Sequence, residues 1–279
     1  MTVNCGLLTT MATYYLGTQS WTYFPDWLGA FYPPRLPQSE ALAFYARVFP
    51  TVEVNTTFHA VPSDATVRGW HARTPPDFRF ALKVPRAITH DLRLALPDAE
   101  PLTRSFLRVA DLLEDKCGPL LVQLPPSFDR SPDNRRALAA FLDWLPAQRR
   151  SVAVELRHAS WVDPAVERAL ADRNVAWCLV EGDQPNRRVL LFTADFTYVR
   201  WNRSGLRFEG FAEVQHDRSE ALDWWADALR RAPPQVRTIW GYMSNEFAGH
   251  APASLRMLAE RLELASVDPR TAWPQGVLF

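Results

Sequence analysis

Acidic, basic and amide side chains recur in this sequence at the ends of short apolar segments. The segment Ser151–Trp161 shows the pattern most clearly, because the β-branched run near its start ends in Glu155, Arg157 and His158. Side chains alternate between the two faces of a strand, so Glu155 and Arg157 would share one face and Val154 would lie on the other. Carboxylates beside guanidinium groups can move protons and bind anions.

Other apolar segments end in the same way, with the polar residue on the face opposite the aliphatic ones. The residues concerned are Glu53, Asn55, Lys83, Gln123, Arg200 and Asn245. Charged groups are costly to bury unless they pair with one another or bind a ligand, and they cluster mainly at functional sites. We therefore expect these side chains to converge on one pocket, and a purely internal set of ion pairs is the alternative.

The elements that would position these residues alternate between strand and helix. Strands are expected at residues 14–17, 51–55, 78–83, 120–123, 152–157, 176–180, 196–200 and 238–243, and helices at 39–49, 63–70, 101–115, 131–145, 164–172, 219–231 and 253–264, with Gly118–Pro119 ending the third helix. This alternation in 279 residues predicts a single (β/α)8 TIM-type barrel of parallel strands. An open doubly wound sheet usually has a glycine-rich first turn, and no G-x-G-x-x-G occurs here. The site would lie at the carboxyl ends of the strands.

Composition limits the partners and the compartment. The formal net charge is zero, which argues against strong binding to duplex DNA through its phosphates. Three widely spaced cysteines, a first stretch without basic residues and the lack of a long apolar run indicate a cytoplasmic protein that does not bind membranes. We expect a disordered extension at 1–12, the barrel at 13–265 and a tail at 266–279, with no cofactor and no metal site.

Seven ordered motifs resemble those of a known family. They are Leu16–Tyr23, Trp27–Pro33, Val52–Phe58, Pro75–Lys83, Ile88–His90, Val122–Phe128 and Val154–Trp161. Together they look like the signatures of the YecE-like proteins, domain of unknown function family 72, over nearly the whole chain. The resemblance implies a TIM-type barrel and leaves the activity open.

The sequence departs from that family's pattern at two strand ends. Where the family usually shows Arg-x-His-Gly, this chain has Arg200-Trp-Asn202, and an Asn-Asn-Asp-like run is replaced by Ser244-Asn-Glu246. A site that needs the histidine after the seventh strand would be altered in this chain.

The favoured hypothesis is an enzyme acting on a phosphorylated or sugar-containing anionic substrate. Two glutamates would share the acid and base roles, with a histidine as proton shuttle and a lysine beside them. The expected catalytic residues are Glu53, Glu155, His158 and Lys83, and the expected substrate-binding residues are Asn55, His90, Gln123, Arg157, Arg200, Asn245 and Trp21. Trp21 would stack on a ring of the ligand, although packing in the local core is the more common role of such a residue.

Two other hypotheses stay open. A metal-dependent phosphoesterase ranks lower, because the strand ends are poor in His and Asp and carry cations that repel a metal ion. The terminus Pro274–Phe279 resembles the Gln-x-x-Leu-Phe peptide that docks onto the replication sliding clamp, which suggests a non-catalytic, nucleic-acid-associated protein. The structural alternative is that Leu278 and Phe279 pack against the barrel of the same chain.

Overall fold

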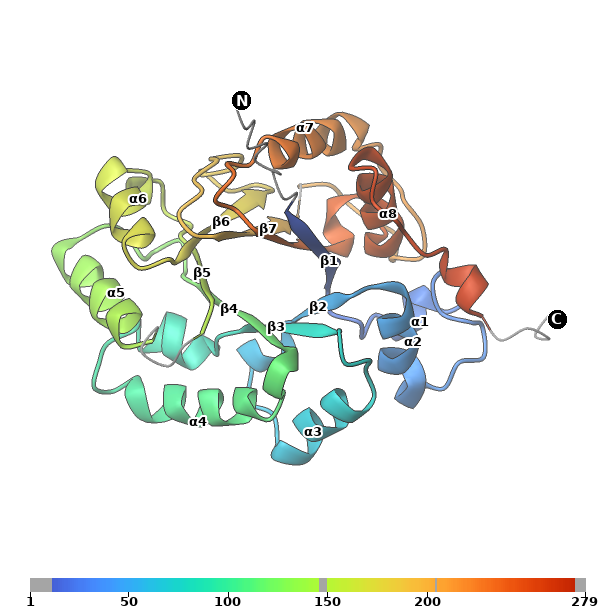
Figure 1. Ribbon diagram of the computed structural model, residues 1–279, viewed down its shortest axis with the longest axis horizontal. Helices are drawn as coiled ribbons and strands as arrows, with labels where there is room; N and C mark the ends of the chain where they lie inside the picture. Colours follow the sequence, from blue (N-terminus) through green and yellow to red (C-terminus); the bar gives the residue numbers. More distant parts are fainter. Residues whose placement is uncertain (1–11, 146–149, 204, 274–279) are drawn as a thin grey trace, which may run out of the picture.

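Eight parallel strands close into a barrel in the computed structural model, which describes residues 12–145, 150–203 and 205–273 (Figure 1). The strands are β1 (Thr13–Gln19), β2 (Thr51–Val54), β3 (Arg79–Lys83), β4 (Cys117–Gln123), β5 (Val152–Glu155), β6 (Ala176–Glu181), β7 (Phe196–Trp201) and β8 (Thr238–Met243). Each strand pairs with the next along the chain, and β8 pairs with β1 to close the ring. The predicted barrel is confirmed.

Helices surround the barrel in Figure 1. They are α2 (Ala41–Val48), α3 (Asp64–Ala72), α4 (Glu100–Asp111), α5 (Pro132–Trp144), α6 (Pro164–Ala171), α7 (Ser219–Arg230) and α8 (Ala251–Arg261), with the short α1 (Phe24–Trp27) in the connection from β1 to α2. Ser63 caps α3, because its side chain accepts a hydrogen bond from the Thr66 N–H. Residues 182–195, between β6 and β7, form bends and turns instead of a helix.

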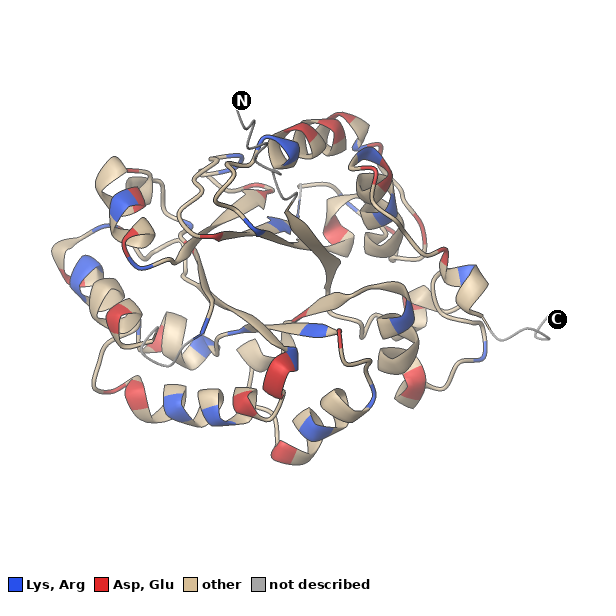
Figure 2. Cartoon of the chain, in the orientation of Figure 1, with Lys and Arg blue, Asp and Glu red and all other residues tan. Residues whose placement is uncertain are grey.

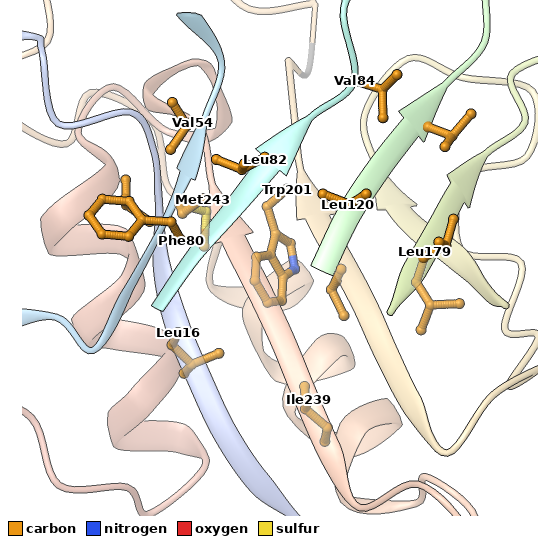
Figure 3. Close-up of a cluster of buried hydrophobic side chains, with 14 of the residues drawn as sticks. Leu16, Val54, Phe80, Leu82, Val84, Leu120, Leu179, Trp201, Ile239 and Met243 are labelled. Atoms are coloured by element: carbon orange, nitrogen blue, oxygen red, sulfur yellow. The ribbon is translucent and has the colours of Figure 1, made fainter. Parts of the chain in front are cut away.

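The strands are buried on both faces. Figure 3 shows apolar side chains such as Phe80, Leu120 and Ile239, which belong to the large core shared with the helices. A second, smaller cluster fills the barrel interior and includes Ala81 and Tyr198. The alternation of side chains that the sequence predicted is therefore correct, and it directs the polar residues at the strand ends into the mouth of the barrel.

One predicted boundary is wrong. Gly118–Pro119 does not end the third helix, because α4 stops at Asp111 and β4 already begins at Cys117. A Cβ atom at position 118 would lie only 3.2 Å from the Phe80 carbonyl oxygen, so glycine lets the two neighbouring strands approach each other closely. The glycine reflects strand packing here, not a helix end.

The chain ends are described only in part. The expected extension at 1–12 lies outside the described residues except for Ala12, and so does the Gln275–Phe279 peptide, so sliding-clamp docking stays a prediction. Within the expected tail, the Trp273 Nε1–H donates to the Phe31 carbonyl oxygen at 3.2 Å. Among the described helices, none has the length and apolar character needed to span a bilayer.

Candidate active site

Arg200, in β7, joins two buried glutamates from strands on other sides of the barrel. Its Nε and Nη2 donate to the two carboxylate oxygens of Glu53 at 2.9 and 3.0 Å, and its Nη1 donates to Glu155 Oε2 at 2.6 Å. Both carboxylates are wholly buried. Ions can stay in such a place only when charge-assisted hydrogen bonds replace their hydration, and the bidentate guanidinium supplies those bonds.

Neutral side chains complete the hydrogen bonding of the two carboxylates. The Tyr198 hydroxyl donates to Glu53 Oε2 at 2.8 Å. The Gln123 Nε2 donates to Glu155 Oε1 at 2.9 Å, and the Gln184 Nε2 donates to the same oxygen at 3.2 Å. We call Arg200, Glu53, Glu155 and these hydrogen-bonded neighbours the mouth network.

The network fixes the protonation state of Glu155. Burial by itself would raise the pKa of this carboxyl, but Arg200 and then Arg157 outweigh burial and lower the pKa to about 2. Burial by itself would lower the pKa of Arg200, but its attraction to Glu53 and Glu155 together outweighs burial and holds the pKa well above its usual value. Glu155 is therefore a permanent carboxylate at neutral pH, and the general-acid role that the sequence suggested for it does not fit.

Lys83, the last residue of β3, stands apart from this network. Its Nζ lies 3.9 Å from the centroid of the Phe58 ring, and the described residues supply it with no hydrogen bond and no carboxylate partner. Burial and the charge of Arg200 lower the pKa of Lys83 from 10.5 to about 8. His90 packs edge-on against the same phenyl ring, and burial together with the charge of Lys83 lowers the pKa of its imidazole.

A cavity of about 300 Å³ opens above the network. Its walls carry amides and guanidinium groups, from Gln19, Gln123, Gln184, Asn202, Arg157 and Arg203, together with the carboxylates of Asp183 and Glu246. An apolar groove of about 350 Å³ between α5 and α6 is slightly larger, but none of the mouth network lines it. Buried titratable groups mark the mouth as the better candidate. Figure 2 shows the wider setting, in which many charged residues lie on the outer helices.

Several polar atoms around this cavity lack partners. The Arg157 Nε, the Gln184 Oε1 and the Asn202 Nδ2 are buried and have no hydrogen-bond partner among the described residues. Arg157 approaches Glu155 only to 3.6 Å. Most buried polar atoms in proteins are hydrogen-bonded, so a group of unpaired donors and acceptors on one wall is a signal of ligand binding.

Two expected site residues have local structural roles instead. The His158 Nδ1 accepts a hydrogen bond from the Ser160 N–H at 3.2 Å and so caps the short turn after β5. Trp21 packs edge-to-face against Trp70 of α3, with ring centroids 5.7 Å apart. The structure therefore does not place the imidazole or the indole on the cavity wall.

The residues that follow β8 and β2 also differ from the expectation. The Asn245 Oδ1 accepts from the Ala251 N–H at the start of α8, while its neighbours Ser244 and Glu246 line the cavity. Asn55 precedes the turn that carries Phe58, and its Oδ1 is buried without a partner among the described residues. Asn245 is thus a helix-positioning residue.

Three residues that the sequence reasoning missed belong to the site. The Gln19 Oε1 accepts a hydrogen bond from Arg200 Nη2 at 3.1 Å. The expected strand ended at residue 17, but β1 continues to Gln19, and alternation along the longer strand places Gln19 on the inward face. Tyr198 lies two residues before Arg200 in β7 and therefore shares its face, which is the signal that could have found it. Gln184 lies in the irregular β6–β7 connection, where no periodic signal marks it.

The described residues contain no group of three or more His, Cys, Asp or Glu side chains placed to hold a metal ion. The metal-dependent alternative therefore gains no support from the geometry. Arg200, which bridges the two carboxylates, supplies the positive charge that a metal ion provides in other barrels.

Comparison with known proteins places the chain in a family. The sequence pattern described as "Protein of unknown function DUF72" matches residues 15–276. This chain belongs to the DUF72 family. Its relatives include the UPF0759 protein YecE of Escherichia coli K12, 34% identical over 161 residues that cover 58% of this chain and 54% of YecE. The UPF0759 protein YunF of Bacillus subtilis 168 is 24% identical over 84% of this chain and 90% of its own length. The chain thus spans about half the length of YecE.

Solved DUF72 structures share the fold. A DUF72 family protein from Enterococcus faecalis V583 superposes with a TM-score of 0.74 and 19% identity, covering 95% of this chain and all of that one. One from Thermotoga maritima MSB8 gives a TM-score of 0.72 and 24% identity over 90% of this chain and 99% of that one. These likenesses establish the barrel and leave the chemistry to the residues themselves.

The departure from the expected DUF72 motif after β7 lies at the cavity. Asn202 occupies the position where the resemblance led us to expect a histidine, and its Oδ1 accepts from Gln19 Nε2 at 2.8 Å. Trp201 faces away from the mouth and packs against Trp225 of α7. In this DUF72 protein the wall at position 202 is therefore a neutral amide that cannot shuttle protons.

Proposed function

We propose that this DUF72 protein is an enzyme that binds a small, hydroxyl-rich, anionic substrate of the sugar-phosphate class at the mouth of the barrel. The observation that carries the proposal is the group of unpaired polar atoms on Arg157, Gln184 and Asn202 around a cavity of about 300 Å³. A volume of this size fits a small metabolite.

Internal ion pairing accounts for only part of the mouth. It explains why Arg200, Glu53 and Glu155 can be buried together, because the guanidinium is paired with both carboxylates. It does not explain Lys83, which is buried without a carboxylate partner among the described residues. It also leaves the Arg157 Nε, which lies 3.6 Å from Glu155, without a hydrogen bond. Buried cations and donors without partners cost stability, so their presence favours a ligand over a purely structural cluster.

The cavity walls indicate the chemistry of that ligand. The amides of Gln19, Gln123, Gln184 and Asn202 can donate to and accept from sugar hydroxyls. Arg157 and Arg203 are the guanidinium groups available to an anion, because Arg200 already donates four hydrogen bonds to its carboxylates and Gln19. The ionised Glu155 can accept a proton or stabilise a developing positive charge, which suits acid–base chemistry on such a substrate.

Thermal unfolding in the presence of candidate ligands tests the proposal. Pentose and hexose phosphates should raise the Tm of the wild type, and the same sugars without phosphate should raise it less. Arg157→Gln should weaken the apparent affinity at least about tenfold, because it removes a charge-assisted contact. Arg168→Gln, an exposed arginine on α6, is the matched control and should bind as the wild type does.

Two results would overturn the assignment. One is a Tm that rises as much with inorganic phosphate as with every sugar phosphate, because the amides of the cavity wall would then contribute nothing to binding the sugar hydroxyls. The other is equal binding by the wild type and Arg157→Gln, which would place the ligand elsewhere.

A further inference from the structure

Lys83 is a buried amine that the surrounding protein leaves uncompensated. Only 8% of the residue is accessible, yet its Nζ has no hydrogen bond or ion pair among the described residues and rests on the face of Phe58 at 3.9 Å. A phenyl ring stabilises an ammonium less than a buried ion pair with good geometry would. The contact holds the amine in place without locking its proton there.

The two carboxylates that could have neutralised Lys83 are both taken by Arg200. Glu53 accepts two hydrogen bonds from this guanidinium, and Glu155 accepts one at 2.6 Å. The charged groups around the amine are Arg200 on β7, Glu53 on β2, Glu155 and Arg157 on and after β5, and His90 after β3. Burial and the arginines prevail over the glutamates, so the pKa of Lys83 falls to about 8.

The only other lysine in the chain shows what a structural lysine looks like here. Lys116 is buried as well, but its Nζ donates to the carbonyl oxygens of His71 and Thr74 at 2.6 Å each and to the Thr74 hydroxyl at 3.2 Å. Those acceptors occupy the three N–H groups of an ammonium, although burial also lowers the pKa of Lys116. Lys83 has none of this support. As the last residue of β3 it lies at the same end of the barrel as the cavity, next to the residues that line it rather than among them.

We propose that the Lys83 amine is a nucleophile that forms a Schiff base with the carbonyl group of a small aldehyde or ketone substrate. The proposal rests on the proposed function, because the substrate would enter the same mouth, and it narrows the substrate class to carbonyl compounds such as the open-chain forms of sugars. A lysine held neutral by desolvation beside other cations is a recognised way to activate this nucleophile.

The chemical step balances without a further reagent. The ammonium gives up one proton to solvent, and the nitrogen lone pair attacks the carbonyl carbon while the π electrons move to oxygen. The resulting carbinolamine loses its hydroxyl group, which takes a proton and leaves as water, and a C=N⁺–H bond remains. One ammonium and one carbonyl thus give one iminium and one water, and hydrolysis reverses the sequence.

Reductive trapping on the full chain tests the proposal. The protein is incubated with glycolaldehyde and sodium cyanoborohydride at about pH 7.5, and the labelled sites are mapped by peptide mass spectrometry over time. Lys83 should be modified at least about tenfold faster than Lys116, because its pKa falls to about 8 and no acceptor holds its Nζ, whereas three acceptors hold that of Lys116. Lys83→Arg, which keeps the cation and removes the primary amine, should lose this label and keep the others.

Each outcome decides one statement. Labelling of Lys83 no faster than that of Lys116, in protein whose α-amino group is labelled normally, would overturn the Schiff-base proposal. Sugar-phosphate binding without labelling at Lys83 would leave the proposed function standing and refute this inference alone. Fast labelling of Lys83 without any sugar-phosphate binding would refute the proposed function and leave the reactive amine standing.

Discussion

Replacing Glu155 by glutamine tests the electrostatics of the mouth in a way that does not require a substrate. Glutamine keeps the shape of the side chain and resembles the protonated carboxyl. The pKa of Glu155 is lowered from 4.5 to about 2, a difference of about 2.5 units. At about 1.4 kcal/mol per unit, the ionised form stabilises the folded protein by up to about 3 kcal/mol at neutral pH.

The pH dependence gives the prediction its sign. Because the folded-state pKa is depressed, the stabilisation is fully present above the unfolded-state value of 4.5 and is lost as the pH falls towards 2. Glu155→Gln should therefore lower the free energy of unfolding by up to about 3 kcal/mol at about pH 7 and by only about 1.4 kcal/mol at about pH 3.

Urea denaturation followed by tryptophan fluorescence measures both values. Glu260→Gln, an exposed glutamate on α8, is the matched control and should change the free energy of unfolding by less than about 0.5 kcal/mol at either pH. A loss for Glu155→Gln that stays the same from neutral to acid pH would refute the reasoning, because it would show that packing rather than charge explains the defect.

Further predictions concern the same barrel. Arg200→Met should lower the free energy of unfolding by about 3–5 kcal/mol in urea denaturation, because it leaves two buried carboxylates without their guanidinium partner. The double variant Arg200→Met, Glu155→Gln should lose less stability than the two single variants lose in sum. Strict additivity of the two losses would mean that the two residues are not coupled. Lys83→Met should raise the free energy of unfolding at about pH 7 by up to about 3 kcal/mol, because it removes a buried ammonium whose pKa is lowered to about 8. This gain in stability over the wild type should vanish as the pH rises from about 8 to the unfolded-state pKa of 10.5. A variant that is equally stable or less stable than the wild type at neutral pH would contradict this. Gly241→Ala should cost about 1–3 kcal/mol, because its Cβ would lie 2.7 Å from the Trp201 ring, and an unchanged denaturation midpoint would show that the ring can move away freely.

The barrel could be predicted from the sequence because each strand is a short apolar, β-branched segment and each helix has apolar residues at helical spacing. Alternation then assigned Glu53, Lys83, Gln123, Glu155 and Arg200 to the mouth, and the structure brings these five together or close by. Such a prediction needs only the strand and its end, both of which are local properties of the chain.

Which of these side chains pair with one another could not be predicted in the same way. The sequence offered Lys83 as a catalytic residue and Arg200 as a substrate-binding one, whereas the structure pairs Arg200 with both glutamates and leaves Lys83 on Phe58. That choice depends on distances across the barrel, which alternation does not encode. His158 failed for a related reason, because a histidine after a strand can cap its own turn as readily as it can face a ligand.

The most direct measurement is the titration of the two lysines by NMR, with ¹³C-labelled lysine incorporated into the protein. Lys83 and Lys116 supply the only side-chain signals, and Lys83→Arg assigns them. If Arg200 takes both carboxylates and leaves the amine uncompensated, the Lys83 signal should titrate with a pKa of about 8. A Lys83 pKa at or above the ordinary 10.5 would mean that a carboxylate holds the ammonium after all, and it would contradict the account of the mouth given above.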